Sequence, residues 1–208
     1  MRLKQRGDTI IEVLFAVTVF AMVAVGSMAI MNQGTAAAQR ALEITLVRQQ
    51  MDSEAQAIRY IHQAYIATYQ KNGTPSTGVA TEWAKMTSKT TGKGASGASE
   101  FGVTAGTTCP ASIPGEKPFL LNARTATLWN NTPSMLPPVG GSLPPYAQII
   151  YNNDSSIKNA YGIWVEAVPS NTTDGPGFVD FHIRACWDSA GSSHPITLGT
   201  IVRLYEPR

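Results

Sequence analysis

The sequence has little of what several protein classes depend on. Only two of its 208 residues are cysteines, which excludes a multi-disulfide scaffold and any all-cysteine zinc or iron–sulfur site. Charged residues make up 14% of the chain, against roughly 25% in an average soluble domain. The net charge of +2 is too small to predict a nucleic-acid partner. Proline is absent before residue 75, so the first third of the chain can form uninterrupted helix.

The N-terminus joins a short basic leader to a long apolar run. Residues 1–7 contain three basic side chains and no acid, and residues 10–31 are apolar except for Glu12 and three small or polar residues. As a helix this run would be about 33 Å long, enough to cross a hydrocarbon core of about 30 Å. Because basic flanks stay on the cytoplasmic side, the pattern predicts a membrane-spanning helix over 8–31 and an exported remainder.

A removable secretory signal is the alternative for this segment. Residues 35–38, Thr-Ala-Ala-Ala, offer a small-residue cleavage site. However, the apolar run is longer than the about 7–15 residues of a usual signal sequence, and it contains a carboxylate. The sequence therefore favours a retained helix, and a mature chain beginning at Gln39 would indicate the alternative.

Glu12 is the one carboxylate in the apolar run. A charged side chain at the centre of a membrane helix costs roughly 2.5–3.5 kcal/mol, so it is normally paired or functional. One interpretation is a capping box, with Thr9 as the N-cap and Glu12 three residues later. A second interpretation, compatible with the first, is a charge pair with another subunit.

Residues 7–14, Gly-Asp-Thr-Ile-Ile-Glu-Val-Leu, resemble the processing site of type IV prepilins and the related pseudopilins. The resemblance implies that prepilin peptidase cuts between Gly7 and Asp8 and removes the leader 1–7. It also implies that Glu12 compensates the N-terminal amine of a neighbouring subunit during assembly. One departure is Asp8, where the family commonly has phenylalanine with a methylated amine. The Asp8 carboxylate lies beside the new amine, so Asp8 joins Glu12 as a residue expected to act in assembly.

The helix is expected to continue beyond the apolar run, as an amphipathic segment over 32–72. Asn72 and the following glycine form a natural C-cap, and proline follows at residue 75. Three- and four-residue steps relate most of the apolar positions, which predicts one stripe packed under the C-terminal domain. These positions are Val47, Met51, Ala55, Ile58, Ile61, Tyr65 and Tyr69.

Residues 73–208 are predicted to form an exported, β-rich head. Loops are expected over 74–145, with short elements near 81–86 and 119–122. Four strands are predicted over 146–152, 160–168, 177–187 and 197–205, joined as one antiparallel meander. The third strand alternates, with apolar residues on one face and Asp180, His182 and Arg184 on the other. The fold class is therefore α+β, and the helix-plus-sheet head resembles the pilin architecture.

Cys109 and Cys186 are predicted to form a disulfide, because an exported chain occupies an oxidising compartment. Two free or metal-bound thiols are the alternative. Asp180, His182 and His194 are residue types found in hydrolases, but no nucleophile motif accompanies them, so exposed sheet polarity explains them better. We therefore expect no enzymatic activity, no cofactor and no metal.

These features together predict a structural subunit of a type IV pilus. The expected partners are further copies of the chain in a helical filament, the membrane during biogenesis, prepilin peptidase and the pilus assembly platform, with no nucleic acid. The expected location is the cytoplasmic membrane before assembly and the extracellular pilus afterwards. Two alternatives stay open: a minor pilin or pseudopilin of a secretion or DNA-uptake machine, and a membrane-anchored binding protein or hydrolase that never polymerises.

Overall fold

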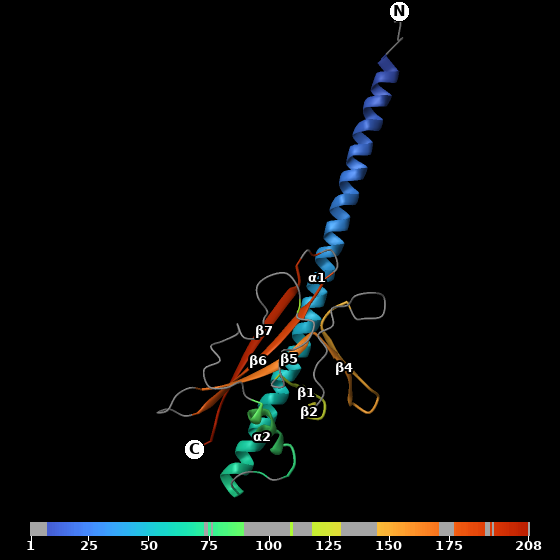
Figure 1. Cartoon of the computed structure of the whole chain (residues 1–208). Coiled ribbons are helices and arrows are strands. Elements are labelled where there is room, and N and C mark those ends of the chain that lie inside the picture. The colour runs from blue at the N-terminus through green and yellow to red at the C-terminus, as the bar shows by residue number, and fades with distance from the viewer. Residues whose placement is uncertain are drawn as a thin grey trace, which may run out of the picture. The chain divides into compact units, whose positions relative to one another are not determined.

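The computed structural model confirms an α+β fold with a long N-terminal helix and antiparallel sheets (Figure 1). It describes residues 8–72, 75, 77–89, 109, 118–129, 145–170, 177–189, 192 and 194–207. The chain divides into two compact units, Met1–Leu42 and Glu43–Arg208. Helix α1 (Asp8–Asn72) is continuous in both units and ends at the predicted residue.

The first unit is the apolar part of α1. Its large apolar side chains are exposed on every side of the helix, and α1 is long and apolar enough to cross a membrane. Hydroxyl side chains in this unit bond to the helix itself: the Thr18 hydroxyl donates to the Phe15 carbonyl at 2.8 Å, and the Ser27 hydroxyl donates to the Val23 carbonyl at 2.8 Å. Each hydroxyl thereby has a hydrogen-bond acceptor within the helix and does not require one from water.

The second part of α1 carries the predicted apolar stripe, which packs in the core of the second unit. Val47, Ile58 and Ile61 are 0% exposed, and Met51 is 3% exposed. They contact apolar side chains of the sheets and of helix α2 (Thr81–Ser88). Because buried apolar area contributes about 25 cal/mol per Å², this stripe is the main attachment of helix to head.

Polar side chains on α1 add specific bonds to the head. Gln50 accepts a hydrogen bond from the backbone N–H of Ile149 at 2.6 Å, and Glu54 accepts one from Leu121 at 3.0 Å. Glu43 accepts a bond from the indole N–H of Trp187 at 3.1 Å. The Gln50 and Glu54 bonds satisfy backbone N–H groups of the two small sheets, and the Glu43 bond satisfies the indole N–H of Trp187. Together they fix the register of helix against sheet.

The larger sheet is an antiparallel meander of β5 (Ile163–Pro169), β6 (Phe178–Trp187) and β7 (Ile196–Tyr205). The predicted alternation of β6 is confirmed. Five side chains of its apolar face are buried, and those of Asp180, His182 and Arg184 on the other face are partly exposed. The buried residues are Val179, Phe181, Ile183, Ala185 and Trp187.

The predicted single meander of four strands is wrong. The first predicted strand is β3 (Gln148–Tyr151), and it pairs with β4 (Ile157–Tyr161) in a separate two-stranded sheet. The predicted strand 160–168 is divided at Gly162, which has a φ of 64°. A Cβ at this position would collide with the Cys186 carbonyl oxygen. Gly162 therefore ends one strand and re-aims the chain into the next.

Short elements do form near 81–86 and 119–122. Helix α2 covers the first, and β1 (Leu120–Asn122) pairs with β2 (Thr127–Trp129) in a hairpin. The Glu82 carboxylate accepts a hydrogen bond from the Leu128 N–H at 2.8 Å, and Lys85 donates to its other oxygen at 2.6 Å. Helix α2 is thereby tied to the hairpin.

Candidate functional site

The candidate assembly site is at the start of α1. Helix α1 begins at Asp8, so Thr9 lies in its first turn. Gly7, the predicted leader and the side chains of Asp8 and Thr9 lie outside the described residues. The cleavage after Gly7, the Thr9 cap and the assembly role of Asp8 therefore stay predictions.

Glu12 is exposed and surrounded along the helix by exposed apolar side chains. The flanking residues Ile11 and Val13 are 70% and 60% exposed, and Phe15 is 70% exposed. Glu12 makes no hydrogen bond or ion pair with any residue that the structure describes. The next charged residue along the chain is Arg40, which is about 42 Å further along a helix. The described residues therefore place no positive charge near Glu12 along the helix.

The helix around Glu12 exposes more apolar surface than a surface helix of an ordinary soluble monomer does. Fourteen large apolar side chains between Ile10 and Met31 are 44% to 76% exposed. A helix that is apolar on all sides is buried in lipid or among other helices. The site thus combines a wide exposed apolar surface with one exposed carboxylate.

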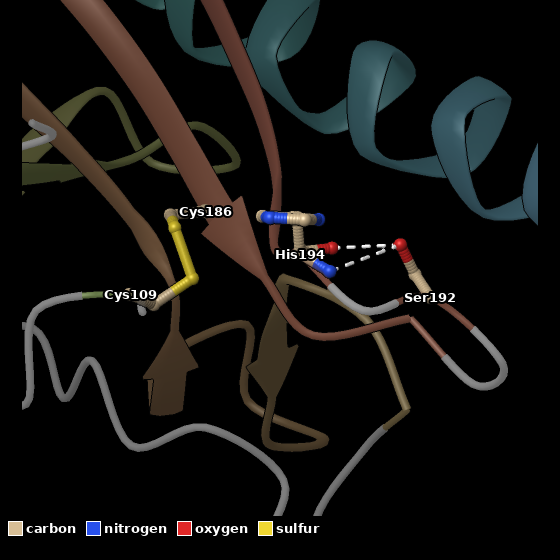
Figure 2. The surroundings of a disulfide bond; sticks show 4 residues. All are labelled: Cys109, Cys186, Ser192 and His194. Carbon is tan, nitrogen blue, oxygen red and sulfur yellow. Dashed lines mark hydrogen bonds between the residues drawn. A yellow bond between two sulfur atoms is a disulfide. The ribbon is translucent and has the colours of Figure 1, made fainter. Parts of the chain in front are cut away.

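The predicted disulfide is present between Cys109 and Cys186, whose Cα atoms are 5.7 Å apart (Figure 2). Among the described residues no free cysteine remains, so the alternative of free or metal-bound thiols is wrong. The two cysteines pack against Trp164, which is 1% exposed. The bond thereby fastens the segment at Cys109 to the sheet face opposite α1.

Two buried carboxylates were not singled out from the sequence. Glu54 is 0% exposed, and burial raises its pKa to about 8. Glu166 is 2% exposed, accepts a hydrogen bond from the Trp164 indole at 2.6 Å and lies 3.5 Å from Arg184. Burial raises the pKa of Glu166, and Trp164 and Arg184 oppose that rise. A signal for Glu54 was present, since it lies within the apolar stripe between Met51 and Ile58.

On the polar sheet face, described bonds connect Asp180 to Arg203, and between β6 and β7 they connect Ser192 to the backbone of His194. Asp180 accepts two bonds from Arg203, at 2.7 Å each. Burial, followed by the charge of Arg184, lowers the pKa of His182. The Ser192 hydroxyl donates to the backbone carbonyl of His194 at 2.8 Å and accepts from its N–H at 3.4 Å (Figure 2). These contacts join no hydroxyl or carboxylate to an imidazole.

The described residues also contain no cluster of three or more histidine, cysteine or acidic side chains able to hold a metal ion. Compared with family models, with curated proteins and with solved structures, the chain matches none.

Proposed function

We propose that this chain is a type IV pilin-like subunit. It is inserted in the membrane as a single-span precursor, trimmed after Gly7 and assembled into a helical filament. The observation that carries this proposal is Glu12, an exposed carboxylate without a partner among the described residues, on a helix whose surroundings are apolar on every side. The β-rich head, attached to the second part of α1, supplies the outer surface of the filament.

Assembly in this proposal needs no catalytic residue in the chain. Packing the apolar helices against one another replaces the contacts that each makes with lipid. Cleavage after Gly7 creates a positive amine at Asp8, and the Glu12 of a neighbouring copy pairs with it. Two unit charges about 4 Å apart interact by about 4 kcal/mol at an effective dielectric constant of about 20. An unpaired Glu12 inside the bundle would carry a penalty of similar size, so the pair fixes the axial register of neighbouring helices.

A membrane anchor that never polymerises is the main competitor, because an apolar helix of this length serves either purpose. The two functions differ at Glu12. In an isolated anchor no neighbouring amine offsets the cost of burying the Glu12 carboxylate, and the capping box with Thr9 is the one use that remains for it. A minor pilin or pseudopilin would use Glu12 in the same way and would differ in its abundance in the filament.

The test is to replace Glu12 with Ala and with Gln and to measure the filament recovered by shearing. Both variants remove the negative charge, and we expect both to reach the membrane while filament yield falls at least about tenfold. The matched control is Asp52→Asn, which removes an exposed charge from the second part of the same helix and is expected to leave the yield unchanged. Abundant filaments from both Glu12 variants would contradict the proposal.

A further inference from the structure

Strand β7 is an edge strand of the larger sheet in the part of the chain that the structure describes (Figure 1). At the opposite edge, Phe119 covers β5 by exchanging backbone hydrogen bonds with Val165, at 2.9 and 2.8 Å. Strand β7 pairs with β6 on one side, and no described strand pairs with it on the other. One side of this ten-residue strand therefore has no strand partner among the residues that the structure describes.

The backbone groups that face outward can be identified from the strand register. The Glu206 N–H donates to the Gly177 carbonyl at 2.8 Å, so Glu206 faces β6. The pairing of β6 with β7 runs without interruption from Tyr205 to Ile196, so facing alternates along it. The outward residues are Thr197, Gly199, Ile201, Arg203 and Tyr205. His62 bonds to the Tyr205 carbonyl at 2.8 Å, and the other four residues have no outward backbone partner among the described residues.

Along this edge an open space above Gly199 lies next to the exposed side chain of Ile201. A Cβ added at Gly199 would meet only the Ile183 carbonyl oxygen, at 4.0 Å. The space above Gly199 is part of a groove of about 460 Å³, whose lining includes Arg184, Thr197 and Ile201. Ile201, two positions from Gly199 on the same face, is 58% exposed. The strand thus carries an exposed apolar side chain at Ile201 and, two positions away, an open space above Gly199.

Strand β7 carries little of the protection that isolated edge strands usually have. Natural edges are guarded by lysine, proline, bulges or short length. From Ile196 to Tyr205 there is no proline, lysine or acid, and Arg203 is the one charged residue. The Asp180 carboxylate already neutralises Arg203 through two bonds of 2.7 Å. An identical edge can therefore approach without opposing like charges.

We propose that β7 pairs antiparallel with β7 of a second copy, on a two-fold axis at Thr200. In this register Ile201 of each copy lies opposite Gly199 of the other copy, and Thr197 lies opposite Arg203. The Ile201 side chain then occupies the space above the partner's Gly199. A two-fold axis at Ile201 would place the two Ile201 side chains directly opposite each other. An axis at Gly199 would place the two Gly199 residues opposite each other and leave the space above them unfilled. Two Gly199–Ile201 pairs form only in the Thr200 register. The inference does not depend on the filament proposal, because every residue in it lies outside the apolar part of α1.

Cysteine cross-linking of the full chain in detergent micelles tests this register. Directly opposed residues of a hydrogen-bonded antiparallel pair have Cα atoms about 5.5 Å apart, which suits a disulfide. A mixture of Thr197→Cys and Arg203→Cys chains is expected to form heterodimers on mild oxidation, and neither variant alone is expected to cross-link. Heterodimer yield no greater than that of the single variants would overturn the inference, and efficient cross-linking of either variant alone would overturn the register.

Ile201→Lys, added to both chains of the mixture, tests the contact itself. Each cross-strand pair contributes about 0.2–1 kcal/mol, so losing two pairs and adding an edge lysine is expected to lower heterodimer yield about tenfold. Asn159→Lys is the control, because it adds the same charge at an exposed position of β4. Unchanged yield with Ile201→Lys, or an equal loss with Asn159→Lys, would contradict pairing through β7. Glu12→Ala in the same mixture separates the two proposals, since it leaves β7 intact and is expected to leave the yield unchanged.

Discussion

The side chain of Glu54 accepts a hydrogen bond from the backbone N–H of Leu121 at 3.0 Å, in a core where Glu54 is 0% exposed. Its second oxygen, Oε1, has no hydrogen-bond partner among the described residues. Burial raises the pKa of Glu54 to about 8, and the Leu121 bond opposes only part of that rise. The helix therefore holds strand β1 with a carboxyl group that is mainly protonated at neutral pH.

Glu54 should make the head less stable as the pH rises. Between the ordinary glutamate pKa of 4.5 and the folded value of about 8, the folded state keeps a proton that the unfolded state has lost. The free energy of unfolding is then expected to fall by about 1.4 kcal/mol per pH unit from this group. Glu54→Gln keeps an acceptor for Leu121 and removes the titration. Urea unfolding across this pH range is expected to show a shallower decline for Glu54→Gln than for wild type, and parallel curves would contradict the assignment.

The Cys109–Cys186 bond should stabilise the head chiefly by closing a long loop. The cysteines are 77 residues apart in the sequence, and closing such a loop contributes about 4 kcal/mol in the chain-entropy model. A Cys109→Ser, Cys186→Ser double variant is expected to lose stability on that scale in thermal or urea unfolding. Trp164, which packs on the bond, should become more accessible to a fluorescence quencher. Stability and quenching equal to wild type would show that the bond constrains nothing.

Gly162 and Gly199 form a matched pair for testing backbone constraint. At Gly162 the φ is 64°, and an added Cβ would collide with the Cys186 carbonyl. Gly162→Ala is expected to cost about 1–3 kcal/mol of stability. At Gly199 the nearest atom to an added Cβ is 4.0 Å away, so Gly199→Ala is expected to be neutral or slightly stabilising. Similar unfolding midpoints for the two variants would contradict the special role of Gly162.

Periodic features were predictable from the sequence. The α1 stripe at Val47, Met51, Ile58 and Ile61 and the alternation of β6 were confirmed, because spacing alone decides which side chains share a face. The disulfide was predicted from two cysteines and an expected exported location, and the structure contains it.

Other features depended on contacts distant in sequence. The division at Gly162 exists because the Cys186 carbonyl passes close by, 24 positions later in the chain. The acceptor roles of Gln50 and Glu54 depend on strands that lie 99 and 67 positions away. A local pattern carries no record of such partners. Gln50 looked like an ordinary polar position of an amphipathic helix, and the place of Glu54 within the apolar stripe indicated burial but not the strand to which it bonds. The role of Glu12 is visible neither in periodicity nor in contacts within the chain, since its proposed partner is another molecule.

The most direct test of the central claim is mass spectrometry of the intact chain from purified surface filaments. We expect the filaments to contain this chain with a mature N-terminus at Asp8, which would provide the amine proposed to pair with the Glu12 of a neighbour. A chain beginning at Met1 or Gln39, or filaments that lack it altogether, would contradict the account.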